Sequence, residues 1–166
     1  ATALNVPSVN ILAGRQPQDA DLLPCLNTLS ANFKMACHMF SHTGIQPVFE
    51  MINGTDMPRF LVQNIAQAQE MLEAVQHPAL KMQYDCYHLA MMGEDILEGL
   101  QENIEFIGHI QFADCAGRHE PDTGSINYAS IFTWLKQSPY TGFIAAEYRP
   151  SQASEKTFAW KDKYFA

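Results

Sequence analysis

Four oxygen-bearing side chains recur along this chain at nearly even intervals. Each lies within or at the end of a short apolar, β-favouring run, and the separations of 35, 26 and 36 residues each approximate one strand-plus-helix unit. The four are Glu50 in PVFE, Asp85 in LKMQYD, Gln111 in IGHIQ and Glu147 in FIAAE. Because all strand carboxyl ends in a parallel sheet or barrel open onto one face, we expect these positions to share a pocket.

The donor atoms of these four residues suit a divalent cation. Three carboxylates and one amide oxygen are hard ligands without a thiolate, which favours Mg²⁺ or Mn²⁺ over zinc. Around one dication they leave a formal charge of about −1, a small imbalance for a polar pocket. Any one such acid alone is more commonly a solvated strand end or half of an ion pair, and joint placement on successive units makes a shared metal site the alternative.

The elements that must position these residues alternate between strand and helix. The turn-rich stretches separate periodic ones from end to end, and we count five strands. Beyond the runs above, we predict a strand at 9–14, helices at 19–41, 60–76 and 128–135, a strand at 143–148 and a closing helix from 154. This alternation predicts an α/β fold with parallel strands and right-handed crossovers. A doubly wound sheet is possible on this count, but the first strand-to-helix turn lacks a glycine-rich phosphate motif.

Length, charge and cysteine content narrow the class of protein. We expect residues 1–166 to form a single domain. The net charge of −8, with only ten Lys and Arg residues, disfavours nucleic-acid binding. No apolar run approaches the roughly 20 residues of a membrane span, so we expect neither a membrane partner nor a signal peptide. Four cysteines without CxxC pairing are typical of reduced thiols, and we expect a cytoplasmic protein.

Several segments are distinctive in combination. FEMINGTDMPRF (49–60), KMQYDCYHL (81–89), IGHIQFADCAGRHEPDTGSINY (107–128) and GFIAAEYRP (142–150) resemble the hydroxypyruvate isomerase family, a branch of the xylose-isomerase-like TIM barrels. The resemblance implies a (β/α)₈ barrel. Because such a barrel takes about 250 residues, this chain would supply about five of the eight units, from the fourth strand to the last helix. An open half-barrel leaves unpaired strand edges, so we expect a missing N-terminal barrel segment or pairing with another chain, as in a homo-oligomer.

The resemblance also implies roles for particular residues. It places the divalent metal on Glu50, Asp85, Gln111 and Glu147 and makes the two glutamates a proton-transfer pair. It implies substrate contacts for His88, Arg118, His119 and Glu120. From the residues themselves, an arginine suits a substrate carboxylate, whereas His88 either donates to a substrate oxygen, relays a proton or packs at the strand end. For His119, substrate contact and loop stabilisation are both open, and Asn53 either orients Glu50 or serves a turn.

The chemistry implied is an isomerisation of small hydroxy-oxo acids. Hydroxypyruvate would become tartronate semialdehyde, or 2-oxotetronate would become 3-oxotetronate, by proton transfer through an enediolate. Such a reaction needs a base, an acid and an electrophile, which two glutamates and a metal provide. The sequence leaves open which glutamate is the base. The alternatives are a ketose 3-epimerase-like sugar enzyme, or a catalytically incomplete fragment that acts as an interaction module.

Overall fold

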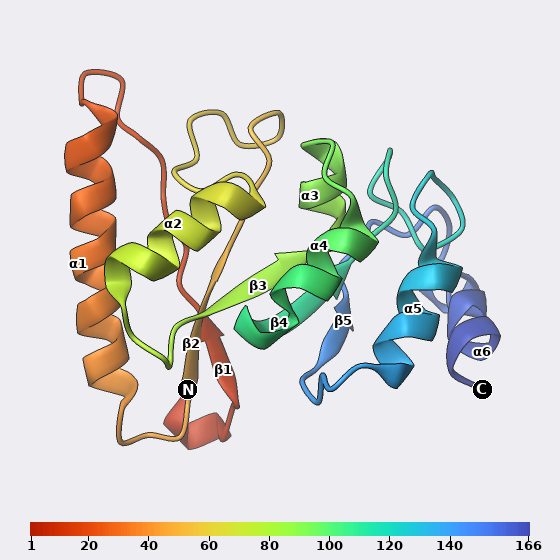
Figure 1. The fold of residues 1–166 in the computed structure, drawn as a ribbon. Coiled ribbons are helices and arrows are strands. Elements are labelled where there is room, and N and C mark those ends of the chain that lie inside the picture. The colour runs from red at the N-terminus through yellow and green to blue at the C-terminus, as the bar shows by residue number, and fades with distance from the viewer.

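The fold is built on one sheet of parallel strands. The computed structural model describes all 166 residues, and each strand of the sheet pairs with its neighbour in sequence order, β1-β2-β3-β4-β5 (Figure 1). The strands are β1 (Ser8–Asn10), β2 (Gln46–Glu50), β3 (Lys81–Asp85), β4 (Ile107–Phe112) and β5 (Ile144–Ala146). The predicted α/β class, the count of five strands and their parallel order are confirmed.

Helices connect the strands and cover one face of the sheet (Figure 1). They are α1 (Leu22–Phe40), α2 (Ile65–Val75), α3 (Cys86–Met91), α4 (Ile96–Asn103), α5 (Tyr128–Gln137) and α6 (Ala159–Phe165), with short 3₁₀ turns η1 (Thr2–Leu4), η2 (Ile104–Phe106) and η3 (Ser154–Lys156). None of them is both long and apolar enough to cross a lipid bilayer.

Side-chain caps decide where α2, α4 and α5 begin, as Asp85 does for α3. Asn64 accepts a hydrogen bond from the backbone N–H of Gln67, and Asp95 and Asn127 do the same for α4 and α5. Such caps satisfy a backbone donor that has no partner within the helix. The cap at Asn64 explains why α2 begins at Ile65 and not at residue 60, where apolar spacing alone predicts its start.

The two faces of the sheet differ in polarity because side chains alternate along each strand. Phe49, Met82, Tyr84, Ile110 and Phe112 belong to the apolar core that also includes residues of α1, α2, α4 and α5. Most of the alternate positions are polar, namely Glu50 on β2, Gln83 and Asp85 on β3, and His109 and Gln111 on β4, whereas Val48 on β2 is apolar. The chain therefore packs one face of the sheet against helices and presents polar side chains on the other.

Phe132 anchors the C-terminal helices, and its truncation tests this packing. Its side chain is 2 % exposed, and its ring centroid lies 5.2 Å from that of Phe112 and 5.1 Å from that of Tyr164. Phe132→Ala is expected to lower the free energy of unfolding by about 3–5 kcal/mol, because it removes a large buried ring and leaves a cavity. Urea denaturation measures the change. Phe143→Ala is the matched control, because that ring is 66 % exposed; equal losses for both variants would contradict the packing argument.

Candidate active site

A cavity of about 540 Å³ lies at the carboxyl ends of the strands. Five of the residues predicted for the site line it, namely Glu50, His88, Gln111, Arg118 and Glu147. Asp85 is not in the wall but lies against two residues that are, with Oδ2 3.9 Å from His88 Nε2 and 3.7 Å from Arg118 Nη2. The structure therefore brings together all four predicted metal ligands and two of the four predicted substrate residues.

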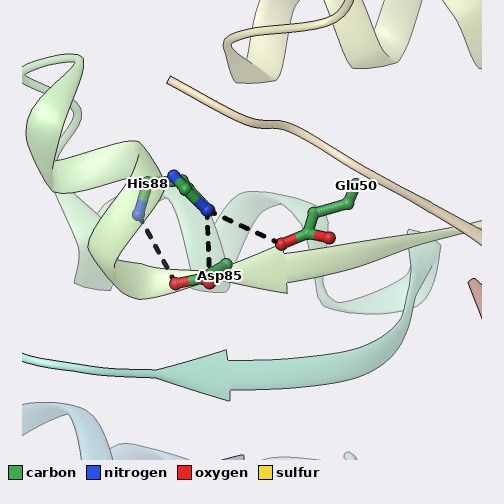
Figure 2. Close-up of side chains that lie close together, drawn as sticks. All are labelled: Glu50, Asp85 and His88. Carbon is green, nitrogen blue, oxygen red and sulfur yellow. Dashed lines mark hydrogen bonds and ion pairs between the residues drawn. The ribbon is translucent and has the colours of Figure 1, made fainter. Parts of the chain in front are cut away.

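Glu50, Asp85 and His88 form the buried part of this site. Figure 2 shows the imidazole of His88 directed between the two carboxylates, with Nε2 4.0 Å from Glu50 Oε1. One ligand atom from each of the three residues lies within 4.8 Å of the others. The residues are only 5 %, 1 % and 3 % exposed, respectively. Two carboxylates and an imidazole so close together are a candidate metal cluster.

The end of β3 fixes the relation between Asp85 and His88. Asp85 is both the last residue of β3 and the cap of α3, and its Oδ1 accepts hydrogen bonds from the backbone N–H groups of Tyr87 (2.8 Å) and His88 (3.4 Å). The first turn of α3 therefore carries His88 back over the carboxylate (Figure 2). Asp85 is also directly in register with Gln111 on β4, so neighbouring strands present these two side chains at the same level.

Two amides that the sequence did not single out hold the predicted ligands in place. Asn10 Nδ2 donates to Glu50 Oε2 at 2.8 Å, and Gln83 Nε2 donates to Gln111 Oε1 at 2.5 Å. Gln83 precedes Asp85 by two residues and so shares its side of β3, a signal that strand alternation contained. Hydrogen bonds of this kind orient metal ligands from behind.

Burial shifts the pKa values of the three innermost groups. Burial, with the nearby Asp85 carboxylate, raises the pKa of Glu50 to about 7. Burial raises the pKa of Asp85 to about 6, against the opposing effect of the Arg118 guanidinium. Burial, with the same guanidinium, lowers the pKa of His88 to about 4, so the imidazole is neutral at pH 7. The buried acids have too little positive charge around them, and a divalent cation fits this donor set.

Arg118 lies in the cavity among acids. Its Nη2 is 3.0 Å from Glu147 Oε2, and its guanidinium carbon lies 5.0 Å from the centre of the Tyr87 ring. A ring on one side and carboxylates on the other fix the orientation of the guanidinium. Arg149, which the sequence argument did not single out, lines the same cavity.

His119 and Glu120 do not line the cavity; they hold the segment after β5. His119 Nδ1 donates to the carbonyl of Arg149 at 2.6 Å. Glu120 accepts hydrogen bonds from the backbone N–H of Ser151 at 3.1 Å and from its hydroxyl at 2.5 Å. Of the two roles left open for His119, these contacts are those of loop stabilisation, and substrate contact for either residue stays a prediction.

Asn53 and His109 are close in sequence to two predicted ligands, since Asn53 follows Glu50 by three residues and His109 precedes Gln111 by two. Asn53 is fully buried, but its amide contacts His88 and Asp56 and makes no hydrogen bond to Glu50. The suggestion that it orients Glu50 is therefore not supported. His109 is in register with Gln83 on the same polar face, and burial lowers its pKa.

A parallel β/α sheet with oxygen ligands at its strand carboxyl ends is the arrangement of β/α-barrel enzymes. Comparison with known proteins agrees: residues 1–164 match the model of the xylose isomerase-like TIM barrel family. The chain belongs to this family.

Two named enzymes and one solved structure show which members of the family the chain resembles. The chain is 34% identical to hydroxypyruvate isomerase of Escherichia coli (strain K12) over 164 residues, which is 99% of this chain and 64% of the relative. It is also 34% identical to 2-oxo-tetronate isomerase of Cupriavidus necator over 156 residues, 94% of this chain and 60% of the relative. A crystal structure titled AP endonuclease, family 2 from Brucella melitensis matches with a TM-score of 0.92 at 28% identity, over 98% of this chain and 62% of that one. The chain thus spans roughly six-tenths of the length of these relatives.

Proposed function

We propose that this chain is part of an isomerase that interconverts small hydroxy-oxo acids, with hydroxypyruvate or 2-oxotetronate as substrate. The observation that carries the proposal is that Glu50, Gln111 and Glu147 line one cavity and that Asp85 lies against Arg118 in its wall. Two of the relatives that are 34% identical over nearly the whole chain are named for those two substrates, which supports the same substrate class.

In this proposal the four oxygen donors hold a Mg²⁺ or Mn²⁺ ion. When bound, the ion supplies an electrophile that offsets the negative charge of the enediolate. The raised pKa values of Glu50 and Asp85 support the assignment, because they report buried carboxylates that lack a compensating cation. Asn10 and Gln83 keep the ligand oxygens of Glu50 and Gln111 directed toward the centre.

The isomerisation requires proton transfers between two carbons, and we assign these transfers to side chains of the site. In hydroxypyruvate a proton leaves C3 and one is returned to C2, while the hydroxyl proton moves from the C3 oxygen to the C2 oxygen. One of Glu50 and Glu147 takes the carbon-bound proton and the other mediates its return. Arg118 binds the substrate carboxylate, for which a planar guanidinium provides paired donors.

The sheet has two open edges, which bear on the extent of the domain. β1 and β5 each pair with only one neighbour, although inner strands pair with two. We propose that residues 1–166 form the fourth-strand to last-helix part of a (β/α)₈ barrel and that further β/α units, from the same protein or a second chain, complete it.

The four cysteines are all free, which supports a reducing, cytoplasmic location.

Metal titration followed by a turnover assay tests the proposed function. Mn²⁺ is titrated into the chain by calorimetry, and hydroxypyruvate is then supplied with a coupled reductase that consumes the aldehyde product. We expect the wild type to bind Mn²⁺ at one site and Asp85→Asn to bind it far more weakly, because the variant loses a charged ligand. Asp162→Asn, an exposed acid on α6, is the matched control.

The outcomes separate the candidate functions. Absence of Mn²⁺ binding by the wild type would contradict the metal site. Binding without turnover would favour the incomplete, non-catalytic chain, and turnover of ketohexoses in preference to hydroxypyruvate would favour a 3-epimerase. The D-allulose 3-epimerase of Methylomonas sp. shares the fold, with a TM-score of 0.75 at 20% identity.

A further inference from the structure

The orientation of the Asn53 amide is fixed by its surroundings. Its oxygen Oδ1 faces two backbone donors, the N–H groups of Thr55 at 3.1 Å and Asp56 at 2.7 Å. Its nitrogen Nδ2 faces Asp56 Oδ2 at 3.0 Å and His88 Nδ1 at 2.7 Å. Exchanging the two atoms would place the NH₂ group against two N–H donors and the oxygen against a carboxylate. The hydrogen-bond network therefore admits one orientation of this buried amide.

This orientation decides where His88 carries its proton. Nδ1 receives the Nδ2–H of Asn53, and the backbone N–H of Asn53 also points at it from 3.5 Å. A proton on Nδ1 would face donors only, so Nδ1 must offer its lone pair. A neutral imidazole protonates one nitrogen and accepts at the other, and the proton therefore lies on Nε2.

The Nε2–H group of His88 points toward the carboxylates of Glu50 and Asp85. Nε2 lies 4.0 Å from Glu50 Oε1 and 3.9 Å from Asp85 Oδ2 (Figure 2). Both distances exceed that of a hydrogen bond, so neither carboxylate takes up the donor. His88 lines the cavity, where an oxygen of a bound molecule can accept from Nε2.

We propose that Asn53 is a positioning residue that fixes His88 as the Nε2–H tautomer, which makes His88 a hydrogen-bond donor to a substrate oxygen and excludes it as a metal ligand. An imidazole nitrogen binds a metal through its lone pair, and here the only lone pair is committed to Asn53. The cluster of Glu50, Asp85 and His88 therefore supplies two ligands, not three. The tautomer follows from the hydrogen bonds alone, and the donation to substrate rests on the proposed function.

Nitrogen NMR measures the tautomer directly. Long-range proton–nitrogen correlation of the ¹⁵N-labelled chain separates a protonated ring nitrogen from an unprotonated one, and comparison with His88→Gln assigns the signals among six histidines. At pH 7 and without metal, we expect Nδ1 of His88 to be unprotonated and Nε2 to be protonated. A protonated Nδ1 in the wild type would overturn the proposal without any variant having to fold.

Asn53→Asp tests whether Asn53 is the cause. A carboxylate at this position still accepts from the backbone N–H groups of Thr55 and Asp56 but turns an acceptor toward His88, so we expect Nδ1 of His88 to gain a proton. The introduced carboxylate would also face that of Asp56, and the double variant N53D/D56N removes this repulsion if the single variant unfolds. An unprotonated Nδ1 in the folded variant would overturn the assignment.

Asp56→Asn is the matched control for the network. An amide at position 56 still offers an oxygen to Asn53 Nδ2 and to the Tyr87 hydroxyl, which donates to the carboxylate at 2.9 Å. We expect the His88 signals to keep the wild-type pattern in this variant. A shift of the proton to Nδ1 would contradict the view that Asn53 alone sets the tautomer.

A second readout concerns the metal and needs no turnover. Electron-nuclear double resonance of the Mn²⁺-loaded chain, with ¹⁵N introduced only at histidine, detects a directly bound imidazole nitrogen by its strong coupling. We expect no such coupling from His88, and a coupling that disappears in His88→Gln would overturn its exclusion as a ligand. If hydroxypyruvate is not a substrate, the tautomer and the coupling still stand or fall by themselves.

Discussion

A chain carrying Glu50→Gln is expected to turn over hydroxypyruvate roughly 10²–10⁴-fold more slowly than the wild type, because an amide cannot take or return the proton. Glu50 is the more buried of the two glutamates, at 5 % exposed, and Asn10 holds its carboxylate at 2.8 Å. The measurement is the coupled assay for the aldehyde product, run with Mn²⁺ at saturation for each variant, so that a lost proton transfer is not confused with a lost ligand.

Two further variants make this result specific. Glu147→Gln is expected to slow turnover in the same range, because the reaction needs both transfers. Glu73→Gln, an exposed acid on α2, is expected to leave the rate within error of the wild type. Unchanged turnover in either Glu50→Gln or Glu147→Gln would falsify the proton-transfer assignment.

Mn²⁺ affinity is expected to fall steeply as the pH is lowered. In the metal-free chain the pKa of Glu50 is about 7 and that of Asp85 about 6, so both carboxyls hold protons at pH 5 that the cation must displace. Treating the two groups as independent, affinity should drop by roughly a thousandfold between about pH 8 and about pH 5. Calorimetry in buffers of different ionisation enthalpy measures both the affinity and the number of protons released. An affinity that stays constant over this range would contradict the arrangement.

The same pKa shifts determine whether the metal-free chain becomes more or less stable as the pH rises. Each carboxyl has a higher pKa in the folded chain than the usual value of about 4 in an unfolded one. The folded state therefore binds more protons, and the free energy of unfolding is expected to decrease as the pH rises from about 4 through 7. Thermal melts over this range measure the trend, and Mn²⁺ should reverse it at neutral pH.

The ends of β2 and β3 were predicted closely, whereas the strand predicted at 9–14 is Ser8–Asn10 and the one predicted at 143–148 is Ile144–Ala146. Glu50 and Asp85 are the last residues of β2 and β3, as the apolar runs before them indicated. The start of α2 was misplaced, because the cap at Asn64 overrides the apolar spacing, whereas α5 begins at residue 128 as predicted. The short helix α3 was not anticipated, since it begins directly at the end of a strand with Asp85 as its cap.

The contacts that support the ligands could not be predicted in the same way. The hydrogen bonds from Asn10 to Glu50, Asn53 to His88 and Gln83 to Gln111 join residues 40, 35 and 28 positions apart. No periodic pattern relates such pairs, because each depends on the register of strands and the path of a loop. The prediction that His119 and Glu120 contact substrate has the same weakness, since they lie in an irregular loop where spacing does not determine direction.

The sequence by itself determined that three acids and one amide lie at or near the carboxyl ends of successive strands. Parallel strands bring their carboxyl ends together whatever the details of packing, so the spacing predicted that Glu50, Gln111 and Glu147 line one cavity, with Asp85 against its wall. Only the tertiary structure decided how each group is held and protonated. Burial, amide orientation and the direction of the His88 proton arise from neighbours that are distant in sequence, and these neighbours meet only when the sheet has formed.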